Sequence, residues 1–272
     1  MPKKLVYLSP SSLQRWFDLG CPAAWDYDKQ FSLTPAGERF LLKQGVDLDT
    51  SWADRGTLVH SMLAGEMPLE SVTDNQAKMF YEKLDQLRQG LMLKAILGSE
   101  ELNQAFEILP GVQWVRRLDL LAEGFSKELL VNDYKTTGAV WKVMPAKKIN
   151  FSPQANGFQG IGYLIPPPEG SKAWQATVEL LGGKFRWPKK ALFLVAGFRG
   201  PAQVFTYKYD KADEENLFEA IRLVESAVRS ESFPKVRSKK CLECPFQMVC
   251  NNVPNHKRFY KPKTHSRKTK NK

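Results

Sequence analysis

The chain has 272 residues, of which 43% are hydrophobic and 25% are charged, an ordinary composition for a soluble globular protein. No apolar run approaches the roughly 18 residues that a membrane-spanning helix needs, and Met1-Pro-Lys-Lys does not lead into the apolar core of a signal peptide. The composition therefore argues against a membrane or secreted protein, and we expect a cytoplasmic location. The length suffices for one large domain or two small ones.

Positive charge is concentrated at the C-terminus. The formal net charge is +11, from 40 basic and 29 acidic residues, and no acidic residue follows Glu243. Eight basic residues fall in the final segment: Lys257, Arg258, Lys261, Lys263, Arg267, Lys268, Lys270 and Lys272. This tail carries +8 of the +11, which leaves +3 for the rest of the chain. Such a tail fits a polyanionic partner, most simply nucleic acid. A solvated end without a dedicated partner explains the charge equally well.

Two short helices are predicted near the N-terminus. Ser9 and the residues after it can cap a helix over Leu13–Leu19, because a serine hydroxyl accepts hydrogen bonds from the free amides of a first turn. Gly20-Cys21-Pro22 ends this helix and begins a second one with three aromatic residues, Trp25, Tyr27 and Phe31. Residues 32–50 are expected to form a connection with some helix.

Two further stretches have the apolar spacing of helices. Ser51–Gly65 places His60 within a helix, where a lone histidine is more often a packed or surface residue than a metal ligand. Thr73–Leu97 is the longest helical pattern, and Thr73 followed by Gln76 fits a capping box at its start. We interpret this long helix as scaffold and keep His60 as a candidate ligand.

The centre of the chain predicts antiparallel strands. A strand over Asn103–Leu109 is followed by the turn Pro110-Gly111 and then by two apolar runs, Val112–Ala122 and Glu128–Lys135. A polar break that contains Gly124 separates the two runs, which is the pattern of a β-hairpin.

Charged residues of this hairpin form a candidate metal site. Strand pairing would bring Asp119 beside Asp133, and Asp133 and Lys135 share a face because side chains alternate along a strand. Two converging carboxylates suit a divalent cation, and a lysine two residues on can hold or activate a water. Glu107 lies in the neighbouring strand, near enough in a three-stranded sheet to reach the same site. Surface charges on a half-exposed strand are the more frequent meaning of this pattern when it stands alone.

A glycine-rich helix is predicted after a basic, irregular segment, Trp141–Ile149. The helix covers Gln154–Ile165 and places Gln159 and Tyr163, four residues apart, on one face. Each of its three glycines would cost about 1 kcal/mol relative to alanine. We expect that cost to be tolerated if a backbone or a nucleic acid strand approaches the helix closely.

The remaining elements before the cysteines are a hairpin and a helix. The stretches Ala191–Phe198 and Gln203–Tyr209 flank Arg199-Gly200-Pro201 and predict a second β-hairpin. Asp213–Val228 has the spacing of an amphipathic helix. No internal repeat or low-complexity segment precedes the basic tail.

The four cysteines form a second candidate metal site. Cys21 stands near the N-terminus, while Cys241, Cys244 and Cys250 form a C-x2-C-x5-C cluster. In a reducing cytoplasm such a cluster indicates metal rather than disulfides, and four thiolates suit either tetrahedral zinc or an iron–sulfur cluster. The metal would tie the two ends of the chain together as a structural clasp. The alternative is that Cys21 is a buried apolar thiol and the other three cysteines bind nothing.

Taken together, these motifs resemble the RecB-like branch of the PD-(D/E)XK nucleases, and more closely its iron–sulfur members, the CRISPR adaptation nucleases and the nuclease domain of AddB. The resemblance covers nearly the whole chain and depends on the order and spacing of its motifs. They are the N-terminal cysteine beside an aromatic helix, Gly56-x-x-x-His60, Asp119, Asp133-Tyr-Lys135, Gln159-x-x-x-Tyr163 and the terminal cysteine cluster.

The resemblance implies a role for each matched residue. His60, Asp119 and Asp133 match the family's ligands of Mn²⁺ or Mg²⁺, with the carbonyl of Tyr134 as a further oxygen donor. Glu107 is one more candidate ligand, at a position whose spacing to the core aspartate varies in the family. Lys135 matches the residue that positions the attacking water. The substrate-orienting motif falls on Gln159 and Tyr163, and the ligands of a [4Fe–4S] cluster, with zinc as the alternative, fall on Cys21, Cys241, Cys244 and Cys250.

The resemblance also implies an α/β fold, a restriction-endonuclease-like core with a central mixed sheet flanked by helices. The expected parts are an N-terminal helical part over 1–98, the nuclease core over 99–230, the cysteine segment over 231–255 and a basic tail over 256–272. Four tail residues are candidate nucleic-acid contacts: Lys257, Arg258, Lys261 and Lys263. Where the family often has glycine and sometimes proline before the core aspartate, this chain has Arg116 and Leu118, which bears on the shape of the DNA channel.

The implied activity is metal-dependent phosphodiester hydrolysis, and we favour an exonuclease that acts on DNA ends or single-stranded DNA. One alternative is a structure-specific endonuclease. Another is a non-catalytic DNA-binding or assembly subunit, against which the intact set of Asp119, Asp133 and Lys135 argues. Proteins of DNA recombination, repair, replication or CRISPR adaptation are the candidate partners, and no membrane partner is expected.

Overall fold

The computed structural model describes residues 5–31, 51–91, 93–99, 103–137, 157–198 and 200–238, with residues 241, 244, 246 and 250. The chain divides into two compact units. The first comprises Met1–Gln14 and Asp49–Glu225, and the second comprises Arg15–Leu48 and Ser226–Lys272. The connection at 32–50, the basic segment at 141–149 and the tail with its candidate contacts lie outside the described residues. No helix in the described ranges is long and apolar enough to cross a membrane.

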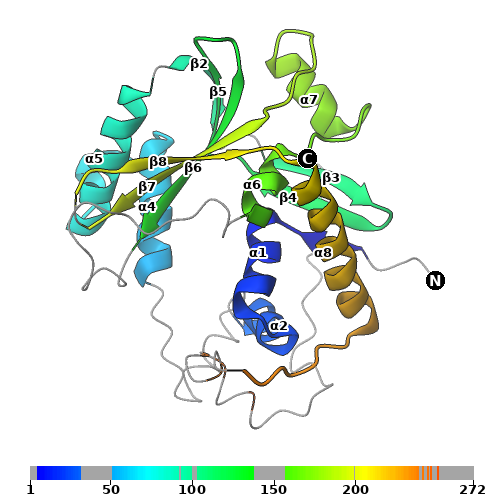
Figure 1. Cartoon of the computed structure of the whole chain (residues 1–272). Helices are drawn as coiled ribbons and strands as arrows, with labels where there is room; N and C mark the ends of the chain where they lie inside the picture. Colours follow the sequence, from blue (N-terminus) through cyan, green and yellow to red (C-terminus); the bar gives the residue numbers. More distant parts are fainter. Residues whose placement is uncertain are drawn as a thin grey trace, which may run out of the picture. The chain divides into compact units, whose positions relative to one another are not determined.

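The larger sheet of the first unit has five strands in the order β2-β5-β6-β7-β8 (Figure 1). They are β2 (Leu93–Ser99), β5 (Leu120–Gly124), β6 (Leu129–Thr137), β7 (Lys190–Gly197) and β8 (Gln203–Lys208). β6 and β7 are parallel and the other pairs are antiparallel, so the sheet is mixed as predicted. Both predicted hairpins are present, as β5–β6 and β7–β8.

A second sheet has three strands in the order β1-β4-β3, which are β1 (Val6–Leu8), β4 (Val112–Arg117) and β3 (Asn103–Leu109). The prediction of one continuous strand over Val112–Ala122 is wrong, because the chain leaves this sheet after Arg117 and enters the larger sheet at Leu120. The alternating burial of β4 gives way to consecutive buried residues from Leu118 on. An apolar run on its own does not reveal such a change of sheet.

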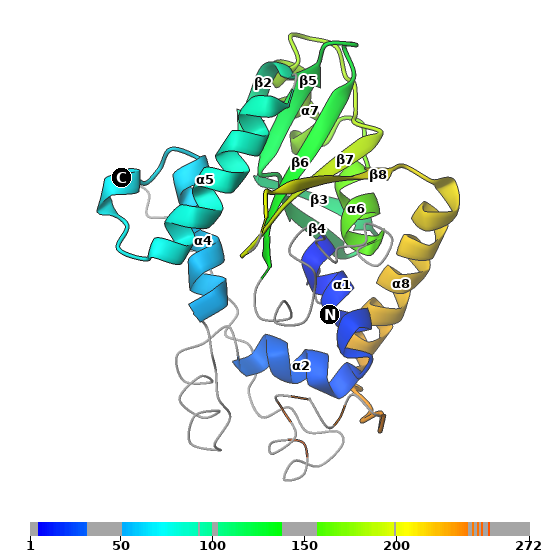
Figure 2. The ribbon, with the colours of Figure 1, turned by 60° about the vertical axis from the view of Figure 1, so that its left-hand side comes forward.

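Helices cover both faces of the larger sheet (Figure 2). Those that pack on it are α4 (Ser51–Leu63), α5 (Asn75–Gly90) and α6 (Gly157–Leu164), whereas α7 (Lys172–Leu180) contacts β3 of the smaller sheet. A 3-10 turn at Leu69–Ser71 precedes α5, and α8 (Lys211–Ser230) follows β8. Apolar residues of α4 and α5, among them Val59 and Phe80, share a buried core with Leu192 and Leu194 of β7. α6 packs on the opposite face, because it meets Tyr207, whose strand partner Ala191 points away from Leu192.

The long helix predicted over Thr73–Leu97 is shorter than expected. α5 ends at Gly90, and Leu93–Ser99 is instead the edge strand β2, paired with β5. The predicted cap is wrong by one residue, since the carboxylate of Asp74 accepts the amide hydrogen bonds of Gln76 and Ala77. Strand pairing therefore overrides the helical spacing of the last residues, and a carboxylate outcompetes the neighbouring hydroxyl as the cap.

Two of the three glycines of α6, Gly160 and Gly162, are explained by side chains of the chain itself. A Cβ at Gly160 would lie 2.6 Å from the Tyr207 ring, and a Cβ at Gly162 would lie 2.8 Å from Trp114. The predicted close approach to this helix is therefore present, but it is made by two aromatic rings and not by a backbone or a nucleic acid strand.

The N-terminal helices form as predicted. α1 (Pro10–Leu19) begins after Ser9, which exchanges hydrogen bonds with Ser12 as a reciprocal cap. Gly20 has a φ of 61° and ends the helix, and Pro22 opens α2 (Pro22–Phe31). Within the second unit, buried residues of α2 pack against Phe246 from the C-terminal segment. Trp25 of α2 also stacks on Phe233, at 6.2 Å between ring centroids.

Candidate active site

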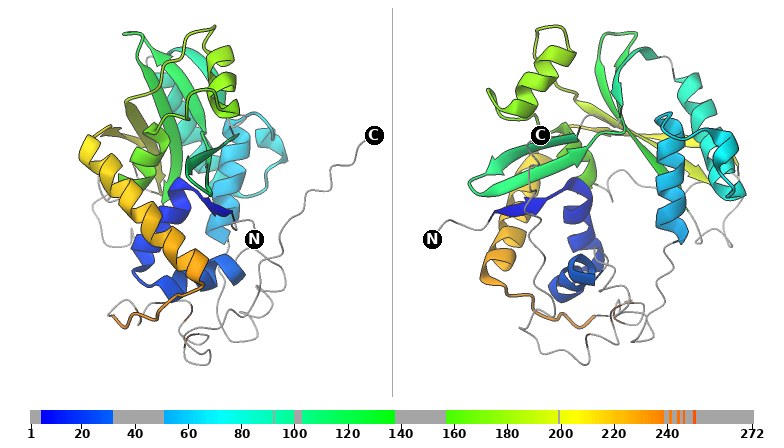
Figure 3. Two further views of the ribbon diagram at one scale, coloured as in Figure 1. Left: turned by 90° about the vertical axis from the view of Figure 1, so that its right-hand side faces the viewer. Right: turned by 180° about the vertical axis from the view of Figure 1, so that it is seen from behind.

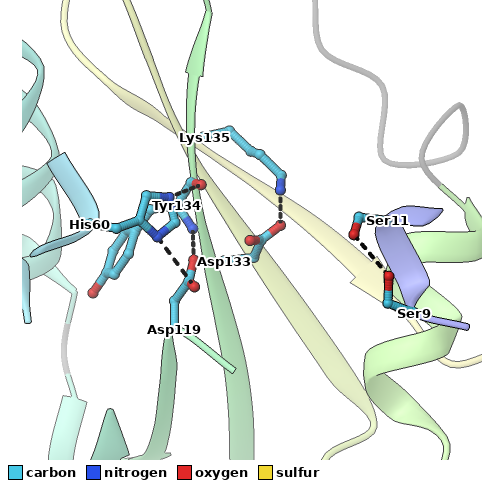
Figure 4. A network of polar contacts seen from close by, with 7 residues as sticks. All are labelled: Ser9, Ser11, His60, Asp119, Asp133, Tyr134 and Lys135. Atoms are coloured by element: carbon cyan, nitrogen blue, oxygen red, sulfur yellow. Dashed lines mark hydrogen bonds and ion pairs between the residues drawn. The ribbon is translucent and has the colours of Figure 1, made fainter. Parts of the chain in front are cut away.

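The candidate site lies where one edge of β6 loses its partner strand. Leu120 pairs with Asn132, and β5 begins there, so β6 continues past its antiparallel neighbour. The backbone groups of Tyr134 are instead satisfied by side chains (Figure 4). The amide of Tyr134 donates to Oδ2 of Asp119 at 2.8 Å, and its carbonyl oxygen lies 3.1 Å from Nε2 of His60. The strand register thus places Asp119 at the open edge, beside Asp133, as predicted.

His60 reaches this edge from α4. Its Nδ1 lies 3.3 Å from Oδ1 of Asp119, and its ring meets that of Tyr134 edge-on at 6.0 Å. Burial alone would lower the pKa of His60, but the hydrogen bond and charge of Asp119, together with the charge of Asp133, raise it above its usual value. An imidazolium in this position donates one N–H to the carboxylate and the other to the Tyr134 carbonyl.

The pKa values of the two carboxyl groups shift in opposite directions. Burial would raise the pKa of Asp119, yet His60, the Tyr134 amide and Lys135 outweigh burial and hold that pKa below its usual value. Burial dominates at Asp133 and raises its pKa to about 7, with the Asp119 charge adding to the shift and Lys135 opposing it. Asp119 is therefore the permanently ionised carboxylate, whereas Asp133 titrates near neutral pH in the metal-free site.

Lys135 pairs with Asp133 on one face of β6, as the alternation of side chains predicts. Its Nζ lies 2.8 Å from Oδ2 of Asp133, and its side chain is 28% exposed, while that of Asp133 is 5% exposed. The amine is thus the solvent-accessible member of the pair. Figure 4 shows the two side chains on the opposite side of the strand from His60.

The helix α6 brings Gln159 and Tyr163 to the face of the sheet that carries Asp133. Both side chains are buried, and Tyr163 is hydrogen-bonded to Gln159 and to Asp133. Burial, with the charges of Asp133 and Asp119, raises the pKa of Tyr163 well above its usual value. Tyr163 therefore remains a neutral phenol that buttresses the carboxyl group.

Arg116 is the structural residue that sequence reasoning undervalued. Its side chain is 1% exposed and donates to Gln104 and to the carbonyls of Gly162, Tyr163 and Ile165. These carbonyls belong to the C-terminal end of α6, so a buried cation caps the helix that carries Tyr163. A charged residue at an inward position of an alternating strand was the available sign.

Glu107 lies apart from the other candidates. It is an exposed residue of β3, in the three-stranded sheet, and its carboxylate accepts the amide of Gly111 at 2.5 Å across the turn. Glu107 could reach the other carboxylates only if one sheet held all three strands. The change of sheet after Arg117 removes that condition.

The cysteines gather within the second unit. Cys21, Cys244 and Cys250 border the core around Ala23, Tyr27 and Phe246. Two sulfurs accept backbone amides, Cys21 from Val236 at 3.5 Å and Cys241 from Ser238 at 3.3 Å. Burial raises the pKa of Cys244 and of Cys250, and the charges of the other cysteines add to both shifts. Cys21 is thus an electrostatic neighbour of Cys244 and Cys250, which are distant from it in sequence.

The donor groups are assembled only in part. Among the described residues, no three side chains of His, Cys, Asp or Glu come together as a ready set of metal ligands. At the β6 edge, Asp119 and His60 are bonded to each other and to the backbone of Tyr134, while Asp133 is paired with Lys135. Their chemistry, two carboxylates with a carbonyl and an imidazole, nevertheless fits a divalent cation.

Comparison with known proteins gives weak similarities of structure alone. No family model matches the chain, and no curated protein matches it. The crystal structure of SSO0001 is similar with a TM-score of 0.38 and 11% identity, over 95% of this chain and 90% of that one. A "putative exonuclease" from Eubacterium rectale is similar with a TM-score of 0.43 and 14% identity, over 93% of this chain and 91% of that one.

Proposed function

We propose that the chain is a metal-dependent DNA nuclease that hydrolyses phosphodiester bonds as an exonuclease on DNA ends or single strands. The observation that carries the proposal is the open edge of β6. There, Asp119, Asp133, His60 and the Tyr134 carbonyl lie around one stretch of strand with the exposed amine of Lys135. A carboxylate-rich site beside a cation is suited to a phosphate substrate.

Each residue has a defined part in this proposal. Asp119, Asp133, His60 and the Tyr134 carbonyl would hold Mn²⁺ or Mg²⁺, which when bound lowers the pKa of a water and neutralises phosphate charge. Lys135 orients the attacking water or stabilises the developing negative charge. Tyr163, fixed by Gln159 and by the Arg116-capped helix, holds Asp133 in place. Glu107 has no part, because its carboxylate serves the turn at Gly111.

The imidazole of His60 bears on the choice of metal. A nitrogen ligand in an oxygen-rich site favours transition metals over magnesium. We expect Mn²⁺ to support activity equal to or above that with Mg²⁺, and His60→Ala to reduce the Mn²⁺ advantage most. Full activity in Mg²⁺ with no gain in Mn²⁺, unaltered in the variant, would exclude His60 as a ligand.

We propose further that Cys21, Cys241, Cys244 and Cys250 bind a [4Fe–4S] cluster. The proximity of the thiols, through which their charges act on one another, and the backbone amides donated to two of the sulfurs support a shared metal site, since such bonds are typical around iron–sulfur clusters. Anaerobically purified protein should be brown and contain about four irons per chain. A colourless preparation with stoichiometric zinc would replace the cluster with a zinc site.

The test of the nuclease is cleavage of end-labelled linear DNA in single- and double-stranded form, with circular DNA as the comparison. Lys135→Ala and Asp133→Ala should each lower cleavage at least 10²-fold, the order of effect of removing one charge-stabilising group. Glu107→Ala, a carboxylate removed from the other sheet, is the matched control and should cleave like the wild type. Equal rates in all three variants would refute the site, and cleavage of circular DNA would favour an endonuclease.

A further inference from the structure

A stack of aromatic rings leads out from the catalytic face of the larger sheet. Trp174 of α7 stacks on Phe185 with 5.4 Å between centroids and 22° between planes, and Phe185 stacks on Trp187 at 6.2 Å and 10°. We call these three residues the aromatic ladder. The indole N–H of Trp187 has no acceptor in the described part of the chain, so its position depends on ring contacts.

The inner end of the ladder is joined to the catalytic residues. The guanidinium of Arg116 lies 4.3 Å from the centre of the Trp187 ring and also donates to the carbonyl of Tyr163. Tyr163 in turn contacts Asp133. After the ladder the chain enters β7 at Lys190, and Phe193 pairs with Asp133 three residues later, which is about 10 Å along a strand.

The outer end of the ladder is partly exposed. Trp174 and Phe185 are half-buried, and within the described ranges the Trp174 ring contacts one other ring, that of Phe185. The segment is tied to the tip of the β5–β6 hairpin, because Arg186 donates to the carbonyl of Lys127 at 3.4 Å. Phe125 at that tip is 69% exposed. Figure 3 shows α7 beside this end of the sheet.

Cations accompany the rings. Lys172 precedes Trp174 by two residues, and Lys184 and Arg186 flank Phe185; all three are exposed. Arg186 is partly neutralised by Glu123, at 3.9 Å. Aromatic faces with adjacent cations are the elements that bind single-stranded nucleic acid, in which bases stack on the rings and cations meet phosphates. A duplex, whose bases are already stacked, cannot use such rings.

We propose that the aromatic ladder binds single-stranded DNA by continuing its stack with a base on Trp174, while Lys172 and Lys184 contact the adjacent phosphates. The proposal deepens the nuclease function proposed above, because it assigns a single strand as the substrate form that approaches Asp133 along this face. Only the role of the ladder in catalysis rests on the proposed nuclease function. Binding itself is measured without cleavage.

The experiment measures the affinity of the wild-type chain and its variants for a fluorescent oligothymidylate and for a duplex of equal length, in EDTA. Trp174→Ala should weaken single-strand binding about 5- to 150-fold, the range for loss of one stacked base, and leave duplex binding unchanged. Trp174→Phe keeps a ring and should stay within a few-fold of the wild type. Tyr7→Ala, which removes a 63% exposed aromatic ring from β1, is the control and should have no effect.

Salt dependence separates the rings from the cations. Lys184→Ala should reduce the log–log salt slope of single-strand binding by about 0.7, whereas Trp174→Ala should leave the slope unchanged. Three outcomes for Trp174→Ala would overturn the proposal. They are an unaltered affinity for single-stranded DNA, an equal loss of affinity for the duplex, and a loss of affinity for single-stranded RNA but not for single-stranded DNA. If these shifts occur and no DNA is cut in Mn²⁺, the ladder stands and the nuclease does not. If DNA is cut and Trp174→Ala leaves the affinity for single strands unaltered, the nuclease stands and the ladder does not.

Discussion

The two groups of candidate ligands are held in different ways. Asp119, Asp133 and Tyr134 lie on or beside regular strands, each at most 8% exposed, and their positions follow from the strand register. The four cysteines of the second unit are partly exposed, and three of them border a core whose buried residues, in the part of the chain that the structure describes, are Ala23, Ala24, Tyr27 and Phe246.

From this difference we expect that the first site keeps its shape without a metal, whereas the proposed cluster site needs its metal. A sheet with helices on both faces supplies enough buried apolar surface to order the residues at its edge. Ligands that come from the two ends of a chain are ordered in part by the metal itself, because metal binding then supplies part of the folding free energy. The predictions below either break this contrast or measure it.

The largest expected effect on stability is the loss of a cysteine ligand. If the proposed cluster is present, Cys250→Ala should remove it and destabilise the second unit by several kcal/mol. In hydrogen exchange, amides of α2 (Pro22–Phe31) should lose most of their protection, while those of β6 (Leu129–Thr137) should lose less. Asp133→Ala is the matched comparison and should leave α2 protected. If α2 and β6 lost equal protection in Cys250→Ala, the two regions would not be held in different ways.

A smaller effect of the opposite sign is expected from Asp133→Asn. Because the pKa of Asp133 rises from 3.8 unfolded to about 7 folded, the folded chain binds the extra proton between those values, and the free energy of unfolding falls as pH rises through that window. An asparagine has no such proton to lose. At pH 8 the metal-free variant should be more stable by an amount on the order of 2 kcal/mol, since each pKa unit corresponds to about 1.4 kcal/mol and the lost pairing with Lys135 offsets part of the gain.

Denaturant unfolding of both proteins between pH 4 and 8, in EDTA, measures this difference. The two stabilities should converge at pH 4 and separate toward pH 8. The difference curve reports the titration of Asp133 together with the change that the loss of its charge makes in the pKa of His60. A variant that is less stable at pH 8 would show that pairing with Lys135 outweighs burial.

Asn132, buried beside Asp133 with no partner for its amide in the described residues, has no explanation in this structure.

The sequence predicted most of the regular strands that position the first site, but not the change of sheet between them. Short apolar runs bounded by turn residues located β3, β6, β7 and β8, and the pairing of Asp119 with Asp133 followed from the β5–β6 hairpin. The break at Leu118 could not be predicted, because an apolar run looks alike whether it stays in one sheet or passes to another. That break also separates Glu107 from the site and makes Arg116 a helix cap. Strand β2 was missed because only its pairing with β5 outweighs helical spacing.

An expected effect of similar size to that of Asp133→Asn concerns α6, the helix that brings Tyr163 to the site. A Cβ at Gly160 would lie 2.6 Å from Cγ of Tyr207, whose ring is held because its hydroxyl donates to Asp213 at 2.5 Å. The ring cannot yield, so Gly160→Ala should cost about 1–3 kcal/mol, as over-packing does. Among the described residues, no heavy atom lies within 4 Å of a Cβ built at Gly157, in the same helix. Gly157→Ala should therefore be neutral or stabilise the chain by up to about 1 kcal/mol.

Thermal unfolding of the two alanine variants, together with their cleavage rates, compares a crowded and an open position of one helix. Gly160→Ala should lower the melting temperature and also the cleavage rate, because a displaced α6 moves Tyr163 away from Asp133. Gly157→Ala should change neither in that direction. If Gly160→Ala melts at a lower temperature yet cleaves at the wild-type rate, the position of α6 has no bearing on the chemistry. Tyr163 would then be a packing residue, and the open edge of β6 alone would carry the reaction.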